Sequence, residues 1–403
     1  MIAEVRMKQA LQALQAYQPE KDLNVFIKTH LKQFPKMGSR DRREVSSLIY
    51  DAIRVKQLFP NADLKQRVWL GQLLCETAVT DFVQHWTEQI TGKPLPDLTD
   101  LTSKLKWLDP LGFVADWSNF FPWSEQISSA VELQSFYAAH LMHPITWIRV
   151  KARALQAFLK ELEAKGIKYQ QHELLPTAIA FPAATKLDQL QHWQSGAIEV
   201  QDLASQMTAA LFAPKKGESW LDACAGSGGK SLMLLDMVSD VRLFVSDIRE
   251  EALTRLHERF KRAGIRSYSR AQADFTQPQP LANAGSFPKQ FDVVLADVPC
   301  SGSGTWSATP ELLISQRQLN LSAFTDRQKA ITTNIVPSIK AGGRLVYLTC
   351  SVYKQENEEV VEYLVATHGL KLVEQQYFQA SAEGGDVLFG AVLVKSASEP
   401  NAN

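Results

Sequence analysis

The segment SWLDACAGSGGK, residues 219–230, decides the fold of this chain. Its first residues form an apolar run typical of a buried strand, and the glycines that follow permit a tight turn into a helix. A strand, a glycine-rich turn and a helix in this order indicate a nucleotide-binding unit, because the turn lets the backbone approach a ligand. Taken alone, the pattern serves NAD, FAD and other nucleotide cofactors equally well.

Strand-like and helix-like segments alternate around this turn. The predicted strands are 219–222, 242–247, 267–273, 291–297 and 344–349, and the predicted helices are 230–237, 250–263, 325–339 and 356–367. Alternation of this kind predicts a mostly parallel sheet with helices on both faces. Two later strand-like runs, 370–376 and 386–395, are close enough in the chain to pair as an antiparallel hairpin. The predicted fold class is therefore α/β, with a Rossmann-like sheet of seven strands that ends in a hairpin.

The N-terminal third has a different pattern of apolar residues. Apolar residues recur at spacings of three and four, which predicts helices at 2–17, 23–34, 45–58 and 68–86. Before the third helix, Asp41 can act as a cap and Glu44 as its capping-box partner. Positive charge is disfavoured at a helix start. The arginines at 40, 42 and 43 therefore indicate either a solvated helix start or contacts with RNA phosphates.

The changes in residue pattern along the chain predict three domains and a tail. Residues 1–140 form a helical domain with a connector, and residues 141–205 form a small α+β module in which a strand, an amphipathic helix and an alternating segment follow one another. Residues 206–396 form the α/β domain. Residues 397–403 are expected to be a loose tail.

Composition narrows the class of protein. The 403 residues have 45% hydrophobic content and zero net charge, which is typical of a soluble chain of two or three domains. Residues 1–60 hold 11 lysines and arginines against 6 acidic residues, a weak indication of a nucleic-acid partner. Neither a membrane span nor a signal peptide is recognisable, so we expect a cytoplasmic protein.

The four cysteines, at positions 75, 224, 300 and 350, include no Cys-x-x-Cys pair, which argues against a metal site and against a disulfide framework. Cys75 and Cys224 are interpreted as buried small hydrophobic residues, the commoner role of an isolated cysteine. The other two follow buried strands. Cys300 lies in the segment FDVVLADVPCSG (291–302), and Cys350 lies in RLVYLTCS (344–351). The carboxyl ends of neighbouring strands share one edge, so both thiols should face one crevice.

Acidic residues also end the predicted strands. Asp247 lies 18 residues after Gly229, where a carboxylate can accept hydrogen bonds from ribose hydroxyls. Asp274 ends the next strand and could bound an adenine. Asp297 ends the strand before Cys300.

Two thiols beside an acid suit methylation of a pyrimidine at C5. This carbon is a poor nucleophile until a thiolate adds to C6. Asp297 could hydrogen-bond N3 of the ring and offset the developing charge if it holds or shares a proton. Lys230, at the start of the first helix, could lower a thiol pKa or orient the base. A second thiol could then assist removal of the C5 proton, but the residues alone do not order the two cysteines.

These segments resemble the Nol/Nop/Sun family of RNA cytosine-5 methyltransferases, and most closely its bacterial branch that contains ribosomal RNA small subunit methyltransferase B. The resemblance rests on residues 221–230, Asp247, Asp274, DVPCSG (297–302) and TCS (349–351) followed by ENE (356–358), with VQDLAS (200–205) as the lead-in. It implies that Cys350 is the nucleophile and Cys300 the release cysteine. It also implies that the helical domain, which is similar to antitermination factors, binds RNA, and that the small module does so too.

The resemblance further implies S-adenosyl-L-methionine as the cofactor, with no metal, and a monomeric protein. The cofactor contacts that it implies are Cys224, Ala225, Gly226, Ser227, Gly228, Gly229, Lys230, Asp247, Asp274 and Asp297. Ser227 stands where the family most often has proline, and Lys151 where asparagine is usual. Residues 306–311 (WSATPE) replace a segment that normally carries arginines, which bears on the RNA target more than on the chemistry.

Three alternatives to an rRNA methyltransferase stay open. The substrate could be tRNA, or the protein could be an RNA-binding ribosome assembly factor without turnover, as the missing arginines suggest. Retention of both cysteines, Asp297 and Lys230 argues against a pure binding protein. In a DNA cytosine methyltransferase, the third alternative, Cys300 would attack the base.

Overall fold

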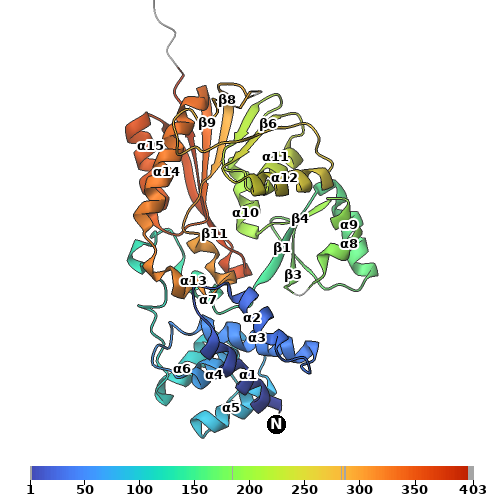
Figure 1. Cartoon of the computed structure of the whole chain (residues 1–403), viewed down its shortest axis with the longest axis vertical. Helices are drawn as coiled ribbons and strands as arrows, with labels where there is room; N and C mark the ends of the chain where they lie inside the picture. The colour runs from blue at the N-terminus through green and yellow to red at the C-terminus, as the bar shows by residue number, and fades with distance from the viewer. Residues whose placement is uncertain (1, 184, 283, 286, 398–403) are drawn as a thin grey trace, which may run out of the picture. The chain divides into compact units, whose positions relative to one another are not determined.

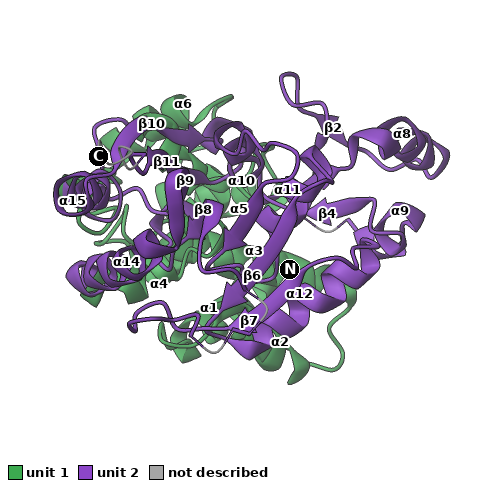
Figure 2. Cartoon of the chain, turned by 90° about the horizontal axis from the view of Figure 1, so that it is seen from above, with its two compact units in different colours: residues 1–125, 133–143, 306–319 green, residues 126–132, 144–305, 320–403 purple. Residues whose placement is uncertain are grey.

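A computed structural model of the chain describes residues 2–183, 185–282, 284–285 and 287–397. The chain divides into two compact units, coloured separately in Figure 2. Unit 1 comprises residues 1–125, 133–143 and 306–319, and unit 2 comprises residues 126–132, 144–305 and 320–403. None of the helices in the described ranges has the length and apolar character that a membrane span requires. The predicted tail lies largely outside the described residues, and the three-domain division stays a prediction.

Unit 1 is helical, as its apolar periodicity predicts. Its α-helices are α1 (Ile2–Ala16), α2 (Leu23–Lys32), α3 (Ser39–Arg54), α4 (Leu64–Cys75), α5 (Asp81–Thr91), α6 (Leu101–Leu108), α7 (Leu133–Ala139) and α13 (Leu312–Ser315). Helices α3 and α4 cross closely at Gly71, where an added Cβ would lie 2.4 Å from the carbonyl carbon of Asp51. A larger residue at 71 would push the two helices apart.

The prediction of one helix over 68–86 is wrong, because the chain leaves the helical conformation between α4 and α5. Glu76 has extended backbone angles, and the Thr80 hydroxyl accepts a hydrogen bond from the Val83 amide to begin α5. The apolar spacing continues across this break, so periodicity alone did not reveal it. The threonine cap was the available signal.

The predicted capping box at the start of α3 is also wrong. Gly38 is the N-cap residue, and Asp41 lies inside the first turn, where it accepts a hydrogen bond of 2.8 Å from Arg6. The Arg42 guanidinium donates to backbone carbonyls at the end of α2, those of Leu31 and Phe34 among them. Arg42 therefore closes a helix end instead of facing solvent, whereas Arg40 and Arg43 are exposed.

Unit 2 contains a seven-stranded sheet in the order β10-β11-β9-β8-β5-β6-β7 (Figure 1). The strands β5 to β9 pair with one another in parallel, and β11 pairs antiparallel with both β9 and β10. Their bounds are β5 (Ser219–Asp222), β6 (Arg242–Asp247), β7 (Ser269–Gln272), β8 (Phe291–Asp297), β9 (Ile339–Thr349), β10 (Lys371–Gln379) and β11 (Val387–Val394). The predicted fold class, with its C-terminal hairpin, is confirmed.

Helices cover both faces of this sheet because its central strands are apolar on both sides. The helices are α10 (Leu203–Met207), α11 (Gly229–Met237), α12 (Glu250–Arg262), α14 (Leu321–Ile335) and α15 (Glu358–His368). Val293 and Leu295 of β8 pack in one core with α11 and α12, while Val294 and Ala296 pack in the other with α14 and α15. Figure 1 shows the two helix pairs on opposite faces.

The α+β module has its own four-stranded sheet, in the order β2-β3-β1-β4. Its elements are β1 (Ile145–Val150), α8 (Leu155–Ala164), β2 (Gln170–Gln171), β3 (Ala178–Pro182), α9 (Gln191–Gln194) and β4 (Ile198–Val200). One face packs around Phe158 of α8, whereas Trp147, Ala178 and Ala180 on the other face join the core of the large sheet. This shared core explains why the module belongs to unit 2.

Candidate active site

The glycine-rich turn connects the end of β5 to the start of α11. Gly226 and Gly228 have positive φ angles of 54° and 82°, which favour glycine. A Cβ on Gly228 would lie within 2.8 Å of the side chains of Phe260 and Leu256 in α12. Gly228 therefore allows α12 to pack against the turn, and it does not line the cavities beside it.

Carboxylates end the parallel strands, as predicted. Asp247 at the end of β6 accepts hydrogen bonds from the Gly226 amide (2.9 Å) and from the Arg249 side chain (3.0 Å). Burial raises the pKa of Asp247, but these hydrogen bonds outweigh burial and hold the pKa below its usual value. Asp274 follows β7 and accepts from the Thr276 amide (2.9 Å).

Two cavities lie along this edge of the sheet, both within unit 2. The first, of about 480 Å³, is lined by Asp247, Ile248, Asp274, Phe275 and other residues. The second, of about 520 Å³, is lined by the glycine-rich turn, Lys230 and both strand-end cysteines, Cys300 and Cys350. Four residues line both cavities, which are therefore adjacent: Cys224, Arg249, Asp297 and Pro299.

The two predicted thiols face each other at this edge. Cys300 follows β8 and Cys350 follows β9, and these strands are neighbours in parallel register. Their Sγ atoms lie 3.3 Å apart. The contact with Cys350, burial and the nearby charge of Glu356 raise the pKa of the Cys300 thiol well above its ordinary value. At neutral pH, Cys300 is therefore expected to stay protonated.

A partly buried ion pair lies in the same cavity as the thiols. The Lys230 ammonium and the Asp297 carboxylate are 2.7 Å apart. Burial alone would lower the pKa of Lys230, but the charges of Asp297, Cys350 and Asp222 outweigh burial and raise it. Lys230 therefore places a positive charge within the same cavity as Cys350.

Asp222 is a residue of the cavity that sequence reasoning missed. It ends β5, its Oδ2 accepts a hydrogen bond of 2.6 Å from Ser231, and its buried Oδ1 has no partner among the described residues. Burial raises the pKa of Asp222 to about 7. The strand-end rule that identified Asp247 and Asp297 applies equally to Asp222 and could have found it.

Cys224 is partly buried at the edge of both cavities, and its predicted contact with the cofactor stays a prediction. Its side chain packs against the core that contains α14, and the residue also lines both cavities. Burial raises the pKa of its thiol well above the ordinary value, which favours the protonated form. Cys75 is buried in α4 of the helical unit.

The WSATPE segment, predicted to affect the RNA target, belongs to unit 1. Trp306 is buried and stacks on Phe121, with ring centroids 5.2 Å apart. Arg54 donates to the Ser307 carbonyl (2.6 Å), and Glu311 accepts from the Leu23 amide (3.4 Å). These packing contacts occupy positions at which the family usually presents arginines.

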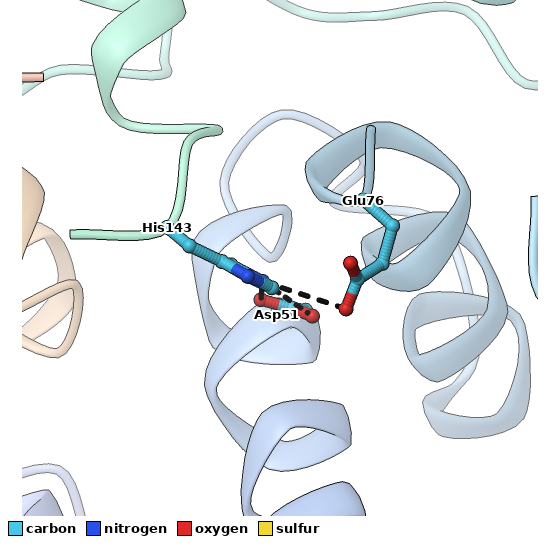
Figure 3. Close-up of side chains that lie close together, drawn as sticks. All are labelled: Asp51, Glu76 and His143. Carbon is cyan, nitrogen blue, oxygen red and sulfur yellow. Dashed lines mark hydrogen bonds and ion pairs between the residues drawn. The ribbon is translucent and has the colours of Figure 1, made fainter. Parts of the chain in front are cut away.

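A separate cluster of Asp51, Glu76 and His143 lies in unit 1 (Figure 3). His143 Nε2 is 3.0 Å from Asp51 and 3.9 Å from Glu76. The hydrogen bond to Asp51 raises the pKa of His143 despite burial. Asp51 also accepts from Gln72 (2.6 Å) and lies 3.9 Å from Arg54. Because a guanidinium and a histidine already balance the carboxylates, we interpret the cluster as an ion-pair network of the helical unit.

Comparison with known proteins places the chain among RNA methyltransferases. Residues 209–388 match the family described as 16S rRNA methyltransferase RsmB/F. The chain is 30% identical over 304 residues to ribosomal RNA small subunit methyltransferase B of Shigella sonnei (strain Ss046), which covers 73% of this chain and 68% of that protein. The resemblance noted in the sequence is thereby confirmed.

Two solved structures share the fold. PH0851 has a TM-score of 0.66 at 20% identity and covers 97% of this chain and 98% of that one. NSun6 from Pyrococcus horikoshii, determined with SFG, has a TM-score of 0.57 at 19% identity and covers 66% of this chain and 95% of that one. The chain therefore belongs to the RsmB/F family of 16S rRNA methyltransferases, RNA methyltransferases that use S-adenosyl-L-methionine as their cofactor.

Proposed function

We propose that this protein transfers a methyl group from S-adenosyl-L-methionine to C5 of a cytosine in RNA, through a covalent bond between Cys350 and C6 of the base. One observation carries the proposal: the two thiols lie 3.3 Å apart in a cavity that also contains the Lys230–Asp297 pair. C5 methylation requires a nucleophile and a general acid or base, and a second thiol can assist release of the product.

The residues at the strand ends fit the cofactor. Asp247 would accept hydrogen bonds from the ribose hydroxyls, with Asp274 and Phe275 bounding the adenine. Asp222 lines the second cavity, and its buried Oδ1 has no partner among the described residues, so this carboxylate would accept a hydrogen bond from the ammonium group of the methionine part. The cofactor supplies an electrophilic methyl group when it is bound.

Cys350 would add to C6 of the cytosine. Lys230 favours this step because its positive charge stabilises the thiolate. As the bond forms, charge develops on the ring, and the proton that Asp297 and Lys230 share would be presented to N3. The ring then carries enamine character at C5, which is the atom that takes the methyl group.

Cys300 would act last. After methylation, the C5 proton must leave and the bond between Cys350 and C6 must break. The two Sγ atoms lie 3.3 Å apart, so Cys300, once it has lost its own proton to solvent, would accept the C5 proton as its thiolate. The electron pair of the C5–H bond would then form the C5–C6 double bond and expel Cys350 as a thiolate. The raised pKa of Cys300 disfavours attack on the base, which leaves addition to Cys350.

The relatives' names favour 16S rRNA as the substrate. A tRNA substrate and a binding role without turnover are the alternatives that the same experiments address. Bisulfite sequencing of rRNA and tRNA from a deletion strain should reveal one cytosine in 16S rRNA that loses its methyl group. If the lost methyl group maps to tRNA, the substrate assignment is wrong, and if none is lost, the protein is a binding factor.

Substitution of each cysteine tests the mechanism. Cys350→Ala should abolish both turnover and covalent capture of RNA, whereas Cys300→Ala should let a protein–RNA adduct accumulate on denaturing gels. Cys75→Ala is the matched control, since this thiol lies in the helical unit. Adduct formation by the Cys350→Ala protein would overturn the assignment.

A further inference from the structure

Glu356 is a buried carboxylate outside the machinery described so far. It ends the short 3₁₀ helix Lys354–Glu356 that precedes α15, and its side chain is 0% exposed. Within the described ranges it forms no ion pair with a lysine or arginine. Burial of a charge without a cation is unfavourable unless hydrogen bonds replace water, so the contacts of Glu356 must supply that stabilisation.

Four hydrogen bonds reach this carboxylate. Its Oε1 accepts from the Ser301 amide (2.8 Å) and from the Gln328 side chain (3.0 Å). Its Oε2 accepts from the hydroxyls of Ser301 and Ser351, each at 2.5 Å. Ser301 follows Cys300 and Ser351 follows Cys350. One carboxylate therefore holds the residue directly after each active-site cysteine.

Neighbouring contacts make the same connection. Gln328 of α14, which donates to Glu356, also donates to the Pro299 carbonyl (3.0 Å). Cys300 is thereby anchored on both sides, through Pro299 and through Ser301. The Gly304 amide donates to the Cys350 carbonyl (2.9 Å), which joins the two turns at a second place.

The charge of Glu356 also distinguishes the two thiols. It adds to the contact with Cys350 and to burial in raising the pKa of Cys300. Lys230, in contrast, is coupled electrostatically to Cys350. Glu356 therefore acts electrostatically on Cys300, and Lys230 acts electrostatically on Cys350.

We propose that Glu356 is a positioning residue for the reaction, which holds the turn after β8 against the turn after β9 so that Cys300 and Cys350 act on one cytosine. The inference rests on the proposed C5 methylation. It predicts that loss of Glu356 impairs the step that needs both sulfurs, release of the methylated RNA, more than binding of RNA or cofactor.

The experiment compares Glu356→Gln and Glu356→Ala with Glu359→Gln, an exposed carboxylate three residues away. An unmodified 16S rRNA transcript and methyl-labelled S-adenosyl-L-methionine serve as substrates. Initial rates give kcat and KM for the RNA, and single-turnover reactions follow formation and decay of the covalent adduct by denaturing electrophoresis. Thermal melting and S-adenosylhomocysteine binding check that each protein is folded.

Glu356→Ala should lower kcat by about 10²-fold, with an unchanged KM and a methylated adduct that persists. The glutamine of Glu356→Gln keeps one acceptor oxygen, and its NH₂ group can donate to the hydroxyls of Ser301 and Ser351. This variant should therefore retain much of the native kcat. Because the glutamine lacks the charge, the release rate of this variant should rise at a lower pH than in the native protein. Glu359→Gln should behave as the native protein does.

Native kcat and native adduct decay in both folded Glu356 variants would overturn the proposal, as would a change confined to KM. If the alanine variant does not fold, the pH dependence of release in the glutamine variant decides. A native protein that forms no 5-methylcytosine in any RNA would instead overturn the proposed function, a result that is visible before any variant is compared.

Discussion

The turn after β8 and the turn after β9 have nearly the same sequence design and different surroundings. Each begins at the end of a buried parallel strand and presents a cysteine followed by serine. The charge of Glu356 helps to raise the pKa of Cys300, whereas the Lys230 ammonium interacts electrostatically with Cys350, which lines the same cavity. The difference teaches that residues from other elements, and not the local motif, give two similar turns different electrostatic surroundings, which support the proposed roles of Cys350 as nucleophile and Cys300 as release group.

The largest effect on a reaction rate should come from removing the positive charge of Lys230. Lys230→Met should slow adduct formation by roughly 10²–10³-fold, because it removes the cation that the proposed mechanism uses to favour attack by Cys350 and to supply a proton to N3 with Asp297. Rapid-quench measurement of adduct formation checks this, with the exposed Lys216→Met as the control. If adduct formation is native and only its decay is slow, Lys230 serves Cys300 instead.

A pH-dependent change in stability should follow from Asp222. Its pKa is raised to about 7 by burial, so its proton stabilises the fold below the unfolded value of 3.8, and this contribution is lost as the pH rises through 7. Asp222→Asn should therefore be more stable than the native protein at pH 8, by on the order of 2–4 kcal/mol, and the gain should shrink towards pH 5.

Urea denaturation at pH 5 and pH 8 measures this difference, with the exposed Asp240→Asn as the control. A gain that is independent of pH would show that Asp222 is already ionised in the folded protein. An ionised Asp222 would add a negative charge near Lys230. The surroundings of Lys230 would then be more negative than the comparison of the two turns assumes.

Smaller effects on the reaction rate are expected from Ser301 and Ser351, and the two serines should affect different steps. Ser301→Ala and Ser351→Ala each remove one hydroxyl from Glu356 and should lower a rate by about 10-fold, the effect of one hydrogen bond to a charged group. Ser301→Ala should slow adduct decay, and Ser351→Ala should slow adduct formation. Equal slowing of both steps by both variants would contradict the division of roles between the turns.

The smallest effect is expected at the third cysteine of the site. Cys224→Ala should leave kcat within about threefold of the native value, because burial raises the pKa of this thiol and its side chain packs against the core. Initial-rate measurements check this prediction. A loss as large as that of Lys230→Met would mean that Cys224 takes part in the chemistry.

Local signals predicted much of the fold and much of the candidate site. Strand, turn and helix alternation gave the parallel sheet, since a buried parallel strand has an apolar run that few other elements share. The strand-end positions of Asp247, Asp297 and the two cysteines followed from the same pattern. The break between α4 and α5 was missed because apolar spacing is blind to a short interruption that leaves the register unchanged.

The sequence by itself determined that two thiols and a row of carboxylates end neighbouring strands, because parallel strands align their carboxyl ends on one edge. Only the tertiary structure decided which charge lies next to which sulfur. Lys230, Cys300 and the segment that holds Cys350 and Glu356 come from three separate places in the chain, and distances between such places depend on how helices pack on the sheet. Electrostatic interaction depends on those distances and on burial, and no local pattern encodes either.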